Sequence, residues 1–427
     1  MAHTWRDRTQ GEPLHISLAA GTLTVSFGGR SNLSFDGEGR LVGAWFDGLT
    51  YRRALDNRVL LKWVDPAQPG LRNRRFLDDA ERRAVLTRAY AAAAQIQAGL
   101  ATGTVDPGDT DAAFVARVEA HLGDVAGWDW ARLEAEHARF HAVYKPISIL
   151  PPDQYLALVL QATEGCSYNE CSFCTFYRDR PFRIAQPAAF SEHIDAVQAF
   201  FGRGLTVRRT LFLADANAVI IPQARLEPLL ELANARFPIL PQALNPAARR
   251  AWRADHPWHL DGIYAFISAP DAQRKTPADF AAMRAQNVAR LYVGLETGHD
   301  PLRAFLRKQG MAADVRAAVA AIKAGGVRIG LIFMVGIGGQ TYRQAHFDDT
   351  VALLRTLPLD AGDLIYLSPF VPSDDSPYVA DAAAAGIAPL DDGALRAEEQ
   401  RFRDALLPWA KARGVRVSHY DVREFVY

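Results

Sequence analysis

All three cysteines of the 427-residue chain lie close together, as Cys166, Cys171 and Cys174. Thiolates gathered on one short loop are good ligands for iron or zinc, and an odd number of them does not suggest a disulfide framework. Structural zinc sites and electron-transfer clusters normally have four protein ligands. Three thiolates on a four-iron cluster would leave one iron open for a cofactor or substrate. The alternatives are a zinc site completed by a histidine such as His193, or three incidental buried thiols.

The segment before the first cysteine predicts the element that positions this loop. LALVLQA (156–162) is a short apolar run typical of a buried strand, and the cysteine loop follows it directly. Similar runs recur at 209–215, 262–268, 290–296, 330–336 and 363–368, with helical stretches between them at 188–203, 223–236, 276–287, 312–324 and 341–356. This alternation is typical of a parallel sheet covered by helices. Six such units predict an α/β fold with a partial (β/α)6 barrel, in which the carboxyl ends of the strands carry the chemistry.

The remaining parts of the chain follow other patterns. Residues 1–150 predict a separate α+β domain, with strands within 15–64 and helices within 77–143, which could cap the barrel or bind substrate. Its densest basic patch, LRNRRF (71–76), is interpreted as a solvated loop or as a contact for an anionic group of the substrate. The barrel is expected over 151–370, and residues 371–427 predict a helix and a strand that extend it.

The cysteine loop has the spacing C-x4-C-x2-C, with the aromatic residue Phe173 before the last cysteine. It resembles the cluster-binding loop of the radical S-adenosylmethionine (SAM) enzyme superfamily. The usual motif has three residues between the first two cysteines, whereas this chain has four, Ser167-Tyr168-Asn169-Glu170, so we expect the loop to bulge by one residue. The resemblance implies that the cysteines hold a [4Fe–4S] cluster and that Phe173 lies beside the adenine of SAM.

Two later segments resemble the branch that includes elongator-like and coproporphyrinogen-dehydrogenase-like enzymes. LYVGLETGHD (291–300) resembles its Gly-hydrophobic-Glu-Ser/Thr-Gly segment, which implies that Glu296 contacts the ribose hydroxyls of SAM. FLRKQG (305–310) then offers Lys308, or its neighbour Arg307, to the SAM carboxylate. FMVGIGGQT (333–341) resembles a Gly-Leu-Pro-Gly-Glu-Thr turn. There the resemblance implies a close approach of the backbone to the ligand at Gly336, Gly338 and Gly339.

Polar residues at three other predicted strand ends complete the expected SAM site. Asp215 lies where the family commonly has Gly-Gly-Glu, a segment that binds the amino group of SAM. The alternative is that an Asp and an Asn here only open a turn. Ser268 and Ser368 end two further strands. Tyr264 and Tyr366 lie on strands and are candidate hydrogen donors to a product radical, with core packing as the alternative.

The resemblance implies a reaction class. A reduced cluster would cleave SAM to a 5′-deoxyadenosyl radical that takes hydrogen from a small-molecule substrate. With all three cysteines used, the chain cannot ligate a second cluster through thiolates, which argues against sulfur insertion from such a cluster. The N-terminal third has no Asp-x-His-x-x-Gly cobalamin motif, since HLGDVAG (121–127) lacks the Asp. Rearrangement, epimerisation, elimination, decarboxylation or cobalamin-free alkylation remains. The family also implies oxygen sensitivity and a one-electron reductant such as flavodoxin or ferredoxin.

The charge balance bears on partners and location. Lys+Arg and Asp+Glu both number 48, so the formal net charge is zero, which argues against the alternative of an RNA-modifying enzyme. A non-catalytic iron–sulfur or zinc protein is the other alternative.

No apolar run reaches the roughly 20 residues that span a bilayer, and MAHTWRDRTQGEP carries no signal core. We therefore expect a cytoplasmic protein without a membrane partner.

Overall fold

The computed structural model describes residues 2–9, 11–66 and 72–427 and divides into two compact units. The first comprises Met1–Ile147, Asp195–Arg209 and Arg423–Tyr427, and the second comprises Ser148–Ile194 and Thr210–Val422. The first unit is thus completed by a segment from the middle of the chain and by the C-terminal residues. Among the described residues, no helix is both long enough and apolar enough to cross a membrane.

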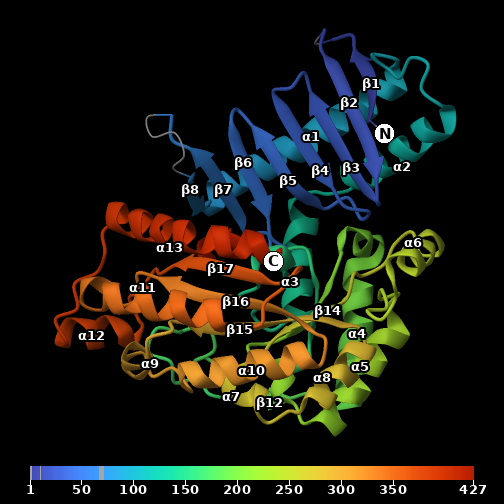
Figure 1. The fold of residues 1–427 in the computed structure, drawn as a ribbon. Coiled ribbons are helices and arrows are strands. Elements are labelled where there is room, and N and C mark those ends of the chain that lie inside the picture. The colour runs from blue at the N-terminus through green and yellow to red at the C-terminus, as the bar shows by residue number, and fades with distance from the viewer. Residues whose placement is uncertain (1, 10, 67–71) are drawn as a thin grey trace. The chain divides into compact units, whose positions relative to one another are not determined.

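The first unit is an antiparallel sheet in the order β8-β7-β6-β5-β4-β3-β2-β1-β9, with its helices packed on one face (Figure 1). Alternating apolar residues such as Leu23 and Val25 are buried on that face, because successive side chains of a strand point to opposite sides. The long helix α1 starts at a capping box between Asp78 and Glu81. The elements are β1 (Ala2–Asp7), β2 (Pro13–Ala19), β3 (Thr22–Phe27), β4 (Ser31–Phe35), β5 (Leu41–Phe46), β6 (Leu49–Arg53), β7 (Val59–Val64), β8 (Arg72–Phe76), α1 (Asp79–Thr102), β9 (Val105–Asp106), α2 (Ala112–Ala126) and α3 (Trp130–Val143).

The second unit is built on a parallel sheet in the order β10-β13-β14-β15-β16-β17-β18 (Figure 1). Its strands are β10 (Leu158–Gln161), β13 (Leu211–Ala214), β14 (Ile263–Phe266), β15 (Val288–Glu296), β16 (Arg328–Val335), β17 (Leu364–Pro369) and β18 (Arg416–His419). The helices are α4 (Pro187–Phe201), which runs on into the first unit, α5 (Gln223–Arg236), α6 (Pro246–Asp255), α7 (Ala269–Ala272), α8 (Pro277–Ala285), α9 (Asp300–Phe305), α10 (Ala312–Ala324), α11 (Gly339–Thr356), α12 (Pro377–Ala384) and α13 (Asp392–Arg413).

This sheet confirms the predicted α/β fold with a partial barrel and a separate N-terminal sheet domain. Each of the six expected strands is present, and each pairs in parallel with its neighbour. The predicted strand of the tail is β18, which pairs in parallel with β17 and becomes a seventh strand of the sheet. The sheet does not close on itself, so β10 and β18 are its two edges. The six expected strands are almost wholly buried, which explains their continuous apolar runs.

Candidate active site

The cysteine loop is tied at its base by a small two-stranded ribbon. β11 (Thr163–Glu164) pairs with β12 (Arg183–Ile184), and the three cysteines lie on the chain between these strands. Gly165, at the start of the loop, has a φ of +77°, and a Cβ there would lie 2.9 Å from the carbonyl oxygen of Pro181. Both the backbone conformation and the close approach of the two loop ends therefore require glycine at this position.

The extra residue of the loop is accommodated at Asn169. Its φ is +53°, in the left-handed region that Asn tolerates better than most residues. Its backbone N–H donates to the Sγ of Cys166 at 3.4 Å, and its side-chain amide donates to the carbonyl of Tyr177 at 2.9 Å. On the outer side, the Arg178 guanidinium donates to the carbonyls of Cys174 (2.8 Å) and Cys171 (3.0 Å). The longer spacing is thus built into a fixed loop.

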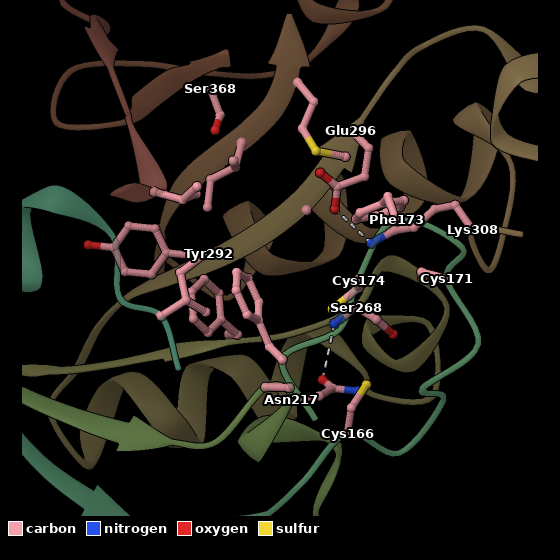
Figure 2. A pocket seen from close by; sticks show the side chains of 18 of the residues that line it. Cys166, Cys171, Phe173, Cys174, Asn217, Ser268, Tyr292, Glu296, Lys308 and Ser368 are labelled. Atoms are coloured by element: carbon pink, nitrogen blue, oxygen red, sulfur yellow. Dashed lines mark hydrogen bonds and ion pairs between the residues drawn. The ribbon is translucent and has the colours of Figure 1, made fainter. Parts of the chain in front are cut away.

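A cavity of about 240 Å³ opens beside this loop at the carboxyl ends of the strands, and all three cysteines line it. Figure 2 shows their side chains together with polar groups from other strand ends. The predicted site residues that line this cavity are Cys166, Cys171, Phe173, Cys174, Ser268, Glu296, Lys308 and Ser368.

Glu296 and Lys308 form an ion pair in the wall of the cavity. The Lys308 ammonium donates to Glu296 Oε1 at 2.9 Å (Figure 2), and both side chains are more than four-fifths buried. Although burial alone would lower the pKa of Lys308, the Glu296 carboxylate raises it, so the amine stays protonated. Glu296 ends β15 with a φ of +59°, a strained conformation for a residue with a side chain. Such strain is typical of positions held for binding.

Asn217 is a cavity residue that the sequence suggested only as part of a turn. Its Oδ1 accepts from the backbone N–H of Ser268 at 3.1 Å (Figure 2), and its amide donates to Asp271 at 2.6 Å and to Ser167 at 3.2 Å. The buried Asp271 also accepts from the hydroxyl of Ser268. Asn217 therefore links the cysteine loop to the end of β14. The signal for it was its place two residues after Asp215 at a strand end.

Several predicted contacts do not line the cavity. Asp215 is buried beside it, where its carboxylate accepts from the Gly165 N–H (3.2 Å) and faces Arg180 (3.5 Å). Burial raises the pKa of Asp215 to about 6. Arg307 points elsewhere and pairs with Asp381 at 2.6 Å. Asp215 thus supports the loop base, and Lys308 is the cation of the pair that faces the cavity.

The predicted glycines and strand tyrosines also lie outside the cavity lining. Gly336, Gly338 and Gly339 are packed against protein, and a Cβ on Gly339 would lie 2.3 Å from the carbonyl oxygen of Ala388. In this structure the glycines of the turn permit close packing of the chain on itself. Tyr366 donates its hydroxyl to Asp153 at 2.8 Å, and Tyr264 is buried in the sheet.

The remaining lining is mostly apolar and aromatic. It includes Ile149, Phe266, Ile332, Met334 and Phe370. Four tyrosines also line the cavity, and three of their hydroxyls have partners: Tyr168 donates to the Arg307 carbonyl, Tyr292 to Asp153 and Tyr420 to the Leu150 carbonyl. The fourth is Tyr177, whose pKa is raised well above its usual value by burial. An apolar lining with a few fixed polar groups is typical of a small-molecule site.

The donor set fits a cluster better than a single ion. All three thiols are free. In the part of the chain that the structure describes, no three His, Cys, Asp or Glu side chains converge as around one metal ion, whereas a four-iron cube takes each thiolate at a separate iron. His193 does not line the cavity, and its Nε2 accepts from the Gln161 N–H. Burial raises the pKa of Cys171, and that of Cys174 to about 11, so metal binding must displace their protons.

One family model matches the part of the chain that carries this site. Residues 160–354 match the family model of the Radical SAM superfamily, and this match confirms the resemblance that the cysteine loop suggested. No curated protein matches the chain.

Three similar solved structures are distant from this chain in sequence. They include the cobalamin-dependent SAM radical enzyme OxsB with aqua-cobalamin and SAM bound (13% identity, TM-score 0.35, 54% of this chain and 30% of that chain). Others are the coproporphyrinogen III oxidase HemN from Escherichia coli (13%, 0.40, 64% and 56%) and Elp3 from the archaeon Methanocaldococcus infernus (10%, 0.35, 62% and 56%). The chain thus spans from under a third to just over half of these proteins. Similarities this distant carry nothing about its own reaction.

Proposed function

We propose that this chain uses the region that matches the Radical SAM superfamily, residues 160–354, to remove a hydrogen atom from a small-molecule substrate. One observation carries the proposal: three free thiols and a buried carboxylate–ammonium pair line a single cavity at the carboxyl ends of parallel strands. In a barrel of this kind, that edge is where catalytic groups gather.

The cofactors are a [4Fe–4S] cluster and SAM, which together supply a carbon-centred radical strong enough to take hydrogen from an unactivated C–H bond. Cys166, Cys171 and Cys174 would hold the cluster. Arg178 and Asn169 would keep the loop in one conformation by binding its carbonyls and the Cys166 sulfur. Outer interactions of this kind orient ligands and tune a metal site.

Other residues would orient SAM and protect the reaction. Lys308 offers a cation for a carboxylate, and Glu296 accepts hydrogen bonds from hydroxyls, both in a partly dry site where charged hydrogen bonds are strong. Phe173 offers an aromatic surface in the same wall. The apolar side chains of Ile149, Phe266 and Ile332 exclude water from the centre of the cavity, which protects a reactive intermediate from side reactions.

The size and lining of the cavity favour a small molecule with an uncharged reacting part. Among the described residues of the lining, Glu296 and Lys308 are the only Asp, Glu, Lys or Arg, and they neutralise each other. With no cysteine left for a second cluster, we propose rearrangement, elimination, epimerisation, decarboxylation or cobalamin-free alkylation as the class of reaction. The partner would be a one-electron reductant such as flavodoxin or ferredoxin.

The test is anaerobic reconstitution followed by reduction. If the protein holds one [4Fe–4S] cluster, reconstitution with iron and sulfide should give four iron atoms per chain. After reduction with dithionite in the presence of SAM, the protein should release 5′-deoxyadenosine. Cys171→Ala should lose both the cluster and this product while keeping the far-ultraviolet circular dichroism of the fold. A fully loaded protein that never cleaves SAM would overturn the proposal.

A further inference from the structure

Tyr177 differs from the other three tyrosines that line the cavity. Its side chain is only 4% exposed, and it lines the cavity together with the three cysteines. Among the described residues, its hydroxyl has no hydrogen-bond partner, whereas the hydroxyls of Tyr168, Tyr292 and Tyr420 each donate to a protein oxygen. A buried tyrosine hydroxyl normally finds such a partner.

The Tyr177 hydroxyl also reaches open space. The described polar atoms that are both unpaired and fully enclosed do not include it. Since Tyr177 is almost wholly buried and borders this cavity, the open space that its oxygen meets is the cavity itself. The ring is held from behind by the Arg180 guanidinium, which lies 5.3 Å from its centre, and Arg180 in turn faces Asp215. A fixed ring with a free hydroxyl is suited to meet a ligand.

Residues beside both edges of the sheet line the same cavity as Tyr177. Ile149 precedes the edge strand β10, and Tyr420 and Val422 follow the other edge strand, β18. The cavity that Tyr177 lines therefore extends to residues next to both edges of the open sheet.

In a cavity where carbon-centred radicals form, the O–H bond of an unpaired phenol can lose its hydrogen atom to a radical. A carbon-centred radical takes hydrogen from the weakest available bond, and a phenolic O–H is weaker than an aliphatic O–H or C–H bond. The thiols are the other weak donors in the chain, and all three would be bound to the cluster. The remaining cavity tyrosines have their protons held by Arg307, Asp153 and Leu150.

We propose that Tyr177 is the catalytic hydrogen donor of this site, which returns a hydrogen atom to a carbon radical in the cavity. This rests on the proposed function. In the step, the Tyr177 O–H bond breaks homolytically, a new C–H bond forms on the substrate, and the unpaired electron remains on the phenoxyl oxygen. One electron from the one-electron reductant and one proton from water restore the phenol. For the substrate, an epimerisation that ends this way is redox-neutral, because one hydrogen atom is removed and one is returned. The one-electron reductant supplies two electrons in all, one to cleave SAM and one to restore the phenol.

The test uses SAM alone, without a substrate. Cluster-loaded protein is exchanged into D2O, so that the Tyr177 hydroxyl carries deuterium, and is reduced with dithionite in the presence of SAM. The wild-type protein should release 5′-deoxyadenosine with one deuterium, and Tyr177→Phe should lose most of this label. Tyr420→Phe is the matched control and should keep the label, because the Tyr420 proton is held by the Leu150 carbonyl.

A spectroscopic measurement separates a donor from a merely structural residue. Samples frozen during turnover should show a tyrosyl radical by electron paramagnetic resonance (EPR), with a signal narrowed by ring-deuterated tyrosine and absent in Tyr177→Phe. A Tyr177→Phe protein that makes 5′-deoxyadenosine with the wild-type label would overturn this assignment alone. If wild-type protein with a full cluster makes no 5′-deoxyadenosine, the proposed function falls and the assignment falls with it.

Discussion

Two sites of buried charge, one in each unit, differ in whether they are closed or open to a cavity. In the first unit, Arg40 is buried among Glu136 (2.5 Å), Asp36 (3.3 Å) and the carbonyl oxygens of Phe200 and Phe201. In the second unit, Glu296 and Lys308 pair with each other but remain open to a cavity beside three thiols. A closed network holds elements together, whereas an open pair at strand ends is available to a ligand. The contrast predicts that mutations in the Arg40 network lower the free energy of unfolding, whereas mutations of the Glu296–Lys308 pair weaken the binding of SAM.

The largest effect is expected at the closed network. Arg40→Met leaves Asp36 buried without its cation and leaves Glu136 with only the exposed Arg139, and breaking a buried ion pair costs about 3–5 kcal/mol. Chemical denaturation followed by circular dichroism should show this loss. SAM cleavage by the fraction that stays folded and loaded should be unchanged. Wild-type stability in Arg40→Met would contradict the contrast between the units.

His346 adds a pH-dependent effect behind the open pair. Its Nδ1 bonds the hydroxyl of Thr297, next to Glu296, and burial lowers its pKa from 6.5 to about 4. Between pH 6.5 and about pH 4, the His346 imidazole is protonated in the unfolded chain and neutral in the folded chain. The free energy of unfolding therefore falls as the pH falls through this window, by about 3 kcal/mol. In His346→Gln, the free energy of unfolding measured from pH 7 to pH 4 should depend less on pH than in the wild-type protein. An unchanged pH dependence would contradict the view that His346 causes this loss of stability.

The adjacent cations Lys308 and Arg307 offer a matched test of the open pair. Hydrogen bonds to charged groups contribute about 1.5–3 kcal/mol, so Lys308→Met should weaken SAM binding about tenfold to hundredfold in equilibrium dialysis. Arg307→Met should leave SAM binding unchanged, because Arg307 pairs with the partly exposed Asp381 outside the cavity. Equal weakening of SAM binding by Lys308→Met and Arg307→Met would contradict the view that only Lys308 faces the cavity.

A smaller effect is expected at Arg178, which binds the cysteine loop from outside. Loss of an outer interaction of this kind typically lowers metal affinity by about tenfold to hundredfold, and we expect the low end because Arg178 is exposed. The rate of iron loss from Arg178→Gln to a chelator reports this change. Arg183→Gln, at the loop base, serves as a charge-matched control, and equal rates in the two variants would argue against the role of Arg178.

Much of the second unit could be predicted because its signals are local. Continuous apolar strands and intervening helices lie where the sequence indicates them, and the cysteine spacing marks the loop. In the first unit, β8 was interpreted as a loop because RNRRF lacks apolar alternation. It forms an edge strand, where charged side chains are tolerated and only one neighbour supplies hydrogen bonds.

The parts of the site that the sequence did not indicate depend on distant contacts. Whether Arg307 or Lys308 faces the cavity is decided by where Glu296 and Asp381 lie, and Asp381 is far along the chain. Gly339 is required by its packing against Ala388, and Gly336 packs against Leu395, contacts that no local motif records. Tyr177 became a candidate only when the partners of the other tyrosine hydroxyls were known.

The central claim is that three thiolates hold a cluster whose remaining iron is open to SAM in this cavity. EPR of the reduced, reconstituted protein tests it most directly. Addition of SAM should shift the g-values of the cluster signal, and Lys308→Met should need more SAM for the same shift. A spectrum that SAM leaves unchanged, or a protein that binds zinc in place of iron, would contradict the account.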